Sequence, residues 1–133
     1  ETRSVAVADF NEDGIKDIAV GNIGQPNIIY FGDENMTFSK SVVFDLDKSN
    51  TFSVAASDLD LDGDIDLVVG NSGQRNVVFF NDRSGSKWIK QELSEMAFDT
   101  YDIITVDLND DGRPDIIEAN SGEVNLFYLN SQN

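Results

Sequence analysis

Short apolar runs recur along the chain, and the first three are Val5–Ala8, Ile18–Gly21 and Ile28–Phe31. The runs are rich in β-branched and aromatic residues, and each one is followed by Gly, Asn or Asp. Runs this short and of this composition predict strands and not helices. No longer stretch has the pattern of a helix, so the sequence predicts an all-β fold.

The same runs return 49 and 98 residues later, so the chain consists of three similar units. The first run matches Val54–Ser57 and Ile103–Val106, the second matches Leu67–Gly70 and Ile116–Ala119, and the third matches Val77–Phe80 and Leu126–Leu129. A fourth, more polar strand is expected near Phe38–Phe44 in the first unit and near Lys87–Leu93 in the second. We find no counterpart of this strand in the third unit.

An antiparallel meander of about four strands in 49 residues is typical of one β-propeller blade. We therefore predict blades at residues 1–49, 50–98 and 99–133, the last one incomplete because it lacks its outer strand. The first two strands of each unit are apolar without alternation, so we expect both of their faces to be covered. Three blades are too few for a closed ring of roughly 4–8 blades. The chain is then a part of a longer propeller, a unit that completes a ring by oligomerisation, or an open wedge.

An acidic phrase follows the first strand of every unit and has the pattern D-x-[DN]-x-D-G-x-x-D. Positions 1, 3, 5 and 9 carry side-chain oxygens, position 6 is a glycine at the sharp turn, and position 7 can contribute only its backbone carbonyl. Such a set suits Ca²⁺, which takes about six to eight oxygen ligands, better than Mg²⁺. The expected ligands of three Ca²⁺ sites are Asp9, Asn11, Asp13, Ile15 and Asp17; Asp58, Asp60, Asp62, Asp64 and Asp66; and Asp107, Asn109, Asp111, Arg113 and Asp115.

Two other interpretations of the acidic phrase are weaker. A single Asp/Asn-Gly loop is typical of a hairpin turn, but three copies at a fixed spacing favour cation binding. The third copy also satisfies the EF-hand pattern, because Glu118 lies twelfth from Asp107. Val20 and Val69 stand at the equivalent places, and strands flank every loop, so we interpret this match as accidental.

The charge of the chain agrees with a metal requirement. Its 133 residues include 25 acidic and 9 basic side chains, for a formal net charge of −16. Ten of the acidic residues stand at positions 1, 3, 5 and 9, which ligate through their side chains; three are in the first loop, four in the second and three in the third. Such acidity excludes nucleic acid and anionic membrane surfaces as partners, and no apolar run reaches the roughly 20 residues of a membrane span. The chain has no His or Cys to bind zinc or copper.

These residues resemble the FG-GAP/VCBS repeat family, the integrin-α-like β-propeller repeats. The resemblance covers Val5 to Asn130. In each unit the matching elements are the first strand, the acidic loop, a second strand that ends in Val-Gly-Asn or Glu-Ala-Asn, a Gly-x-x-Asn turn and an aromatic third strand. It implies that the loop joins the first two strands of a blade and binds Ca²⁺ through the positions named above. It also implies an extracellular, cell-surface or periplasmic location and a role in adhesion or ligand recognition. A complete propeller of this family commonly has more than three blades.

A second repeated phrase, Asn-x-Gly-x-x-Asn, joins the second and third strands at the end of the blade away from the acidic loop. It is typical of hairpin turns, because Asn and Gly readily adopt left-handed conformations. The functional alternative is a ring of polar side chains that could bind a sugar or a peptide: Asn22, Gln25, Asn27, Asn71, Gln74, Asn76, Asn120, Glu123 and Asn125. The single Trp, Trp88, is expected to pack on a blade edge.

The sequence favours a noncatalytic binding or adhesion module, with Ca²⁺ as a structural clamp and a protein or carbohydrate as the ligand. The first alternative is part of a propeller-based enzyme such as a polysaccharide lyase or hydrolase. Against it, the chain has no His, no Cys and no Gly-x-Ser-x-Gly elbow, and nearly all of the carboxylates that could form a glycosidase pair belong to the acidic loops. The second alternative is a self-assembling homo-oligomer that completes a ring, and it is compatible with the binding module.

Overall fold

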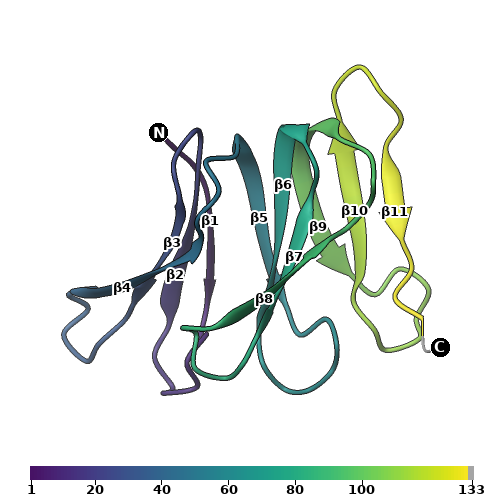
Figure 1. Ribbon diagram of the computed structural model, residues 1–133. Coiled ribbons are helices and arrows are strands. Elements are labelled where there is room, and N and C mark those ends of the chain that lie inside the picture. The colour runs from purple at the N-terminus through teal and green to yellow at the C-terminus, as the bar shows by residue number, and fades with distance from the viewer. Residues whose placement is uncertain (132–133) are drawn as a thin grey trace.

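The fold is that of a computed structural model, which describes residues 1–131. Residues 132 and 133, which the predicted third blade includes, lie outside the described residues. Within this range the chain forms eleven strands and no helix, and therefore no helix that could cross a membrane. The strands form three antiparallel meanders arranged as a fan (Figure 1); the first is a separate four-stranded sheet, and the other two are joined in one seven-stranded sheet. The predicted all-β fold of propeller-type blades is thus confirmed.

Each meander is one blade, in which consecutive strands pair. Blade 1 contains β1 (Thr2–Ala8), β2 (Asp17–Asn22), β3 (Asn27–Phe31) and β4 (Lys40–Asp45). Blade 2 contains β5 (Thr51–Ser57), β6 (Asp66–Gln74), β7 (Val77–Asn81) and β8 (Trp88–Glu92). Blade 3 contains β9 (Phe98–Val106), β10 (Asp115–Asn120) and β11 (Leu126–Tyr128), and among the described residues it has no fourth strand.

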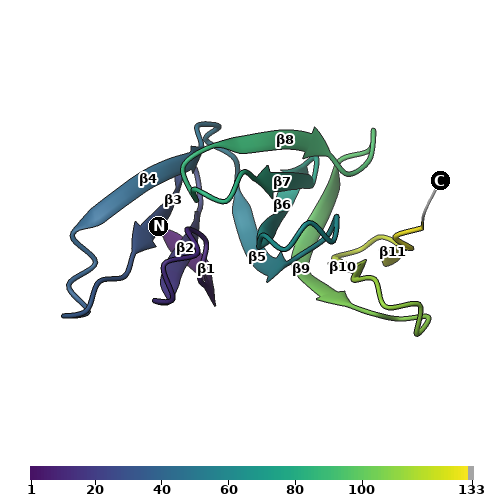
Figure 2. The ribbon, with the colours of Figure 1, turned by 90° about the horizontal axis from the view of Figure 1, so that it is seen from below.

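The first strands of the three blades, β1, β5 and β9, lie next to one another along one side of the fan (Figure 2). The outer strands β4 and β8 lie on the opposite side of it (Figure 2). Blades 2 and 3 are also joined by backbone pairing, because the end of β6 extends beyond its blade and pairs with the start of β9. The described chain is therefore a row of packed blades and not a closed ring.

Two apolar cores lie between the blades, and blade 2 contributes to both. Leu67 and Val69 of β6 are buried against Ala19 of blade 1 and its neighbours. Val68, between them in sequence, is buried on the other face of β6, against Ile103 of blade 3 and its neighbours. Because successive residues of a strand point to opposite faces, a blade between two neighbours needs apolar residues at every position.

The expectation that both faces of the first strands are covered is wrong for blades 1 and 3. Val5 and Val7 of β1 are 57% and 59% exposed, and Ile104 of β9 is 49% exposed. Val54, the residue of blade 2 that is equivalent to Val5, is only 7% exposed. The reason is the number of neighbours, because each terminal blade packs against another blade on one side only.

Trp88 packs on the outer edge of the first core, as the sequence predicts. Its ring contacts Phe10 and Phe44, with centroid separations of 6.0 Å and 5.9 Å. Its indole N–H donates a hydrogen bond of 3.0 Å to the carbonyl of Gly85. β8 thus reaches over from blade 2 and closes the outer edge of the interface with blade 1.

Replacing Trp88 with Ala should lower the free energy of unfolding by about 2–4 kcal/mol, because it leaves a cavity beside Phe10 and Phe44. Ile89→Ala is the matched control, since Ile89 is the next residue of β8 and its side chain is 70% exposed. The control should change stability by about 0.5 kcal/mol or less. Urea denaturation followed by circular dichroism measures both, and equal effects would contradict the packing role of Trp88.

Candidate metal centre

The three acidic loops are the β1–β2, β5–β6 and β9–β10 hairpin connections, and all lie at the lower edge of the fan in Figure 1. In each loop the glycine at position 6 has a positive φ, between 83° and 99°. Position 4 also has a positive φ, between 57° and 62°, although it is not a glycine. The residues there are Glu12, Leu61 and Asp110, and no pattern in the sequence marked this position.

The aspartate at position 1 folds each loop back on itself. In the first loop, Asp9 accepts hydrogen bonds from the backbone N–H groups of Asp13 and Gly14. The same pair of bonds forms in the other two loops, and all six have lengths between 2.8 and 3.1 Å. The three loops therefore share one conformation, as their shared sequence predicts.

The aspartate at position 9 is the most deeply buried candidate ligand of each loop. The carboxylate of Asp17 accepts hydrogen bonds of 2.9 Å from the backbone N–H groups of Phe10 and Gly32. Phe10 is at position 2 of the loop, and Gly32 directly follows β3. Asp66 and Asp115 make the same two bonds in their own blades. Position 9 therefore fastens the loop to the end of the third strand.

The second loop brings three carboxylates together. One oxygen from each of Asp58, Asp60 and Asp66 lies within 4.8 Å of the others. In the part of the chain that the structure describes, this is the one such group of acidic side chains. The first and third loops carry Asn11 and Asn109 at position 3, so each has one carboxylate fewer. Carboxylate oxygens converging at this distance fit a hard cation such as Ca²⁺.

The pKa values in the second loop also indicate crowded negative charge. Burial raises the pKa of Asp66 to about 6, and the nearby charges of Asp60 and Asp62 act in the same direction. The hydrogen bonds from Asn81 and Leu59 oppose this rise. Burial and the charge of Asp62 likewise raise the pKa of Asp60. Burial and the neighbouring charges therefore favour the protonated forms of Asp60 and Asp66 in the absence of a cation.

The side chains at position 7 do not share one role. The buried carboxylate of Asp64 forms an ion pair with Nε of Arg83, at 3.1 Å. Arg83 also donates a hydrogen bond of 2.9 Å to the backbone carbonyl of Asp62. This arginine lies in the connection between β7 and β8, and the repeat pattern gave no signal for it. The second loop thus has a cationic neighbour that partly offsets its larger number of carboxylates.

The model of the FG-GAP-like repeat matches residues 9–69 of the chain and again residues 58–118. The chain belongs to the FG-GAP-like repeat family. Each match begins at position 1 of an acidic loop and ends within the second strand of the following unit. The two FG-GAP-like repeats are therefore offset by the same 49 residues as the loops. No curated protein matches the chain.

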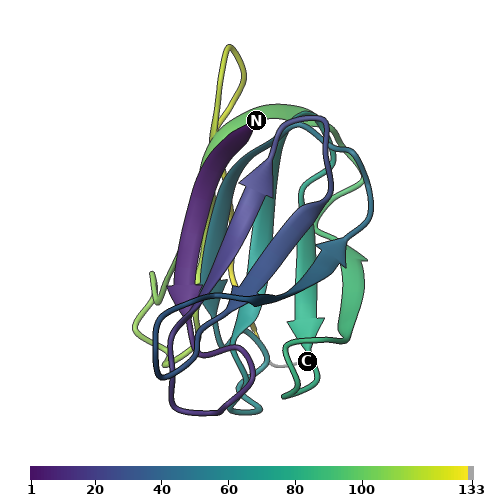
Figure 3. The same ribbon diagram turned by 90° about the vertical axis from the view of Figure 1, so that its left-hand side faces the viewer.

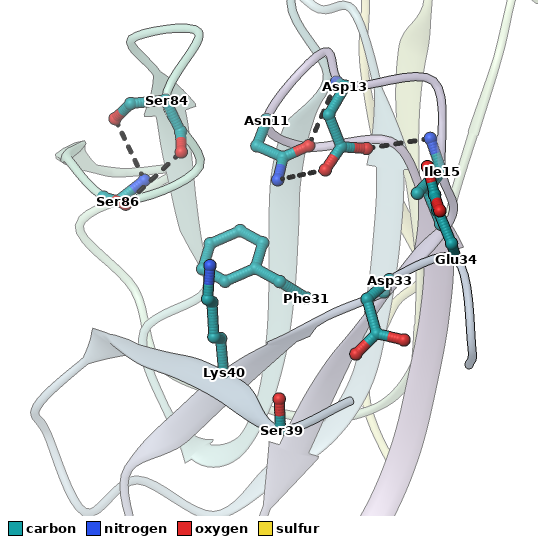
Figure 4. A pocket seen from close by; sticks show the side chains of 11 residues that line it. Asn11, Asp13, Ile15, Phe31, Asp33, Glu34, Ser39, Lys40, Ser84 and Ser86 are labelled. Carbon is teal, nitrogen blue, oxygen red and sulfur yellow. Dashed lines mark hydrogen bonds between the residues drawn. The ribbon is translucent and has the colours of Figure 1, made fainter. Parts of the chain in front are cut away.

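A hollow of about 340 Å³ opens beside the first acidic loop. Figure 4 shows Asn11 and Asp13 of the loop on one side and Asp33 and Lys40 on the other. Ser84 and Ser86, from the connection between β7 and β8 of the neighbouring blade, also line it. The hollow thus joins a candidate metal loop to hydroxyl groups and to charges of both signs.

The second repeated phrase of the FG-GAP-like repeats is largely used in folding. Asn27 is buried, accepts a hydrogen bond from the backbone N–H of Asn22, and donates one of 2.9 Å to Oγ1 of Thr51 in the next blade. Asn76 makes the same bonds to Asn71 and Thr100. Asn22, Asn71 and Asn120 each close their turn through a hydrogen bond to a backbone carbonyl. The exposed members of the phrase are Gln25, Gln74, Glu123 and Asn125.

In a chelating buffer, the free energy of unfolding should fall as the pH rises from about 4 to about 6. Folded Asp66 holds its proton up to a pKa of about 6, whereas the same group ordinarily has a pKa of 3.8. Between these values the folded state binds more protons than the unfolded state, so raising the pH favours unfolding. Urea titrations at several pH values measure this slope. The slope should be smaller in Asp66→Asn, and an identical slope in that variant would contradict the assignment.

Proposed function

We propose that the chain is a calcium-binding module of the β-propeller type that is noncatalytic and acts in extracellular recognition or adhesion. The observation that carries this proposal is the convergence of Asp58, Asp60 and Asp66 in a loop that the chain repeats three times. The backbone conformation that supports the convergence is the same in the first and third loops, so we propose three Ca²⁺ sites.

Calcium would act as a structural clamp. The side chains at positions 1, 3, 5 and 9 would hold the ion, and Ca²⁺ would neutralise their charge. The position-9 carboxylates, such as Asp17, are hydrogen-bonded to the backbone that follows the third strand. Binding energy at a loop is therefore coupled to the folding of its whole blade.

Recognition is proposed for the hollow beside the first loop, with a carbohydrate or a polypeptide as the ligand. Its lining offers hydrogen-bond donors and acceptors in Asn11, Ser84 and Ser86, together with the charged groups of Asp33 and Lys40. The proposed location is extracellular, at the cell surface or periplasmic, and extracellular calcium modules bind with dissociation constants of about 10⁻⁴–10⁻³ M.

Calcium should raise the melting temperature of the protein, and a chelator should lower it. At a concentration of one hundred times the dissociation constant, each independent site would add about 2.7 kcal/mol to the free energy of unfolding. Mg²⁺ should have a smaller effect, because it dehydrates reluctantly and prefers a rigid octahedral site. Differential scanning calorimetry measures this, and a melting curve that is the same in Ca²⁺ and in chelator would rule out the clamp.

The third loop provides a matched pair of variants that separates ligation from charge. Asp111→Asn replaces a carboxylate at position 5, and Asp110→Asn replaces the exposed carboxylate at position 4, which is not a proposed ligand. Both changes remove one negative charge, and Asn tolerates the positive φ of 58° at position 110. Isothermal titration with Ca²⁺ should show a weakened site in Asp111→Asn alone. Equal losses in both variants would indicate general charge attraction and would count against the proposed ligand set.

A further inference from the structure

The two ends of the row of blades carry uncovered apolar faces. The leading face of blade 1, which looks toward the viewer in Figure 3, consists of Val5, Val7, Ile18, Val20 and Tyr30. The trailing face of blade 3 consists of Ile104, Ile117, Ala119, Phe127 and Leu129. Val5, Val7, Ile104, Phe127 and Leu129 are each 49% or more exposed. Contiguous exposed apolar side chains of this kind indicate an interaction surface.

The internal interfaces show what covers these faces elsewhere in the chain. The leading face of blade 2 is made of the residues equivalent to those of blade 1, and Val54, Leu67 and Val69 are buried there against blade 1. The trailing face of blade 2 includes Val68 and Val78, which are buried against blade 3. In both internal interfaces a leading face packs on a trailing face, so the two uncovered faces are of complementary kinds.

A polar contact that both internal interfaces share is left incomplete at the two ends. Asn27 donates to Thr51, and Asn76 donates to Thr100, each from one blade to the next. The next pair in this series would be Asn125 of blade 3 and Thr2 of blade 1. Thr2 bonds to Asn22 within its own blade, as Thr51 does to Asn71. Among residues 1–131, however, no side chain donates to Thr2, and the exposed Asn125 amide has no acceptor.

A stack of side chains on the first strands follows the same order. The guanidinium of Arg3 lies over the ring of Phe52, 5.2 Å from its centroid. The ring of Phe52 in turn packs against Tyr101, with centroids 5.1 Å apart. Tyr101 ends the stack and is 53% exposed. A second Arg3 beyond Tyr101 would make a further cation–π contact.

We propose that two copies of this chain associate head to tail, with the trailing face of each blade 3 on the leading face of the other copy's blade 1. Contacts between unlike faces close into a ring when the rotation permits it, and two copies supply six blades, within the typical range of roughly 4–8. Asn125 and Tyr101 of one copy then meet Thr2 and Arg3 of the other. None of the contact residues is a proposed calcium ligand, so failure of the association and failure of calcium binding are separate experimental outcomes.

Two positions make the new junction looser than the internal interfaces. Ala119 stands where blades 1 and 2 have Gly21 and Gly70, and a Cβ at those glycines would lie 2.6 Å and 3.1 Å from the methyl group of the facing Thr. The second position is Gly32 of blade 1, which is equivalent to Asn81 of blade 2 and Asn130 of blade 3. Each of these asparagines donates a hydrogen bond to the backbone carbonyl at position 2 of the acidic loop in the preceding blade, and Gly32 has no side chain to do so. The junction is therefore wider and lacks this bond, so we expect association that depends on protein concentration.

Sedimentation equilibrium over a range of concentrations tests the proposal. The unmodified chain should approach twice its monomer mass as the concentration rises. Val7→Glu damages only the leading face, and Ile104→Lys damages only the trailing face. Each variant alone should remain a monomer, whereas their mixture should form a dimer, because one intact leading face and one intact trailing face remain. The exposed residue Ile89 on β8 provides the control Ile89→Glu, which should associate like the unmodified chain.

Three outcomes would overturn the proposal. A monomer at all concentrations would mean that something other than a second copy covers the two faces. A dimer abolished by Val7→Glu but not by Ile104→Lys would indicate that two leading faces meet. A mass that keeps increasing with concentration would indicate an open filament. Circular dichroism of each variant must match that of the unmodified chain, and both substitutions are at exposed positions so that the monomer retains its fold.

Discussion

Each blade depends on the two hydrogen bonds that the buried carboxylate at position 9 accepts from the backbone. Asp66 accepts one hydrogen bond from the start of its loop and one from Asn81 at the end of β7. Three strands of the blade are thereby fixed relative to the loop by one side chain. Burying a carboxylate without a positive partner is costly, and the raised pKa of Asp66 expresses that cost. The structural role and the proposed cation site are thus two consequences of the same buried charge.

The blades depend on one another through the pleat of their strands. In β6, alternate residues pack against different blades: Leu67 packs against blade 1, and Val68 packs against blade 3. An apolar run that looks uniform in the sequence is therefore two half-interfaces, one for each adjacent blade. The same rule explains the exposed apolar residues of β1 and β9, which carry the second half-interface without a neighbour on that side.

The repeat made the strands, the loops and the propeller-type blades predictable, because each depends on residues close in sequence. Contacts between blades were not predictable in the same way. The alignment of Thr2, Thr51 and Thr100 is visible in the sequence, but their role depends on Asn27 and Asn76 of the preceding blades. The exposure of the apolar residues could not be predicted from the sequence either. Val5 and Val54 have the same neighbours along the chain, but Val54 is buried by an adjacent blade and Val5 is not. Arg83 lies outside the repeated pattern, so only the fold relates it to Asp64.

The repeats are not interchangeable, because each internal interface contains its own buried acid. Asn27 contacts Asp45, which also pairs with Lys90 of blade 2. Asn76 instead donates to Glu118, which occupies the place of Val20 and Val69 and is fully buried. Burial, followed by the charge of Glu118, raises the pKa of the nearby Tyr128 hydroxyl. Separating blade 1 from blade 2 would leave the buried Asp45 without Lys90, and separating blade 2 from blade 3 would leave Glu118 without Asn76, which is costly in an apolar surrounding. These polar contacts therefore distinguish the two interfaces, while the apolar residues supply the general attraction between the blades.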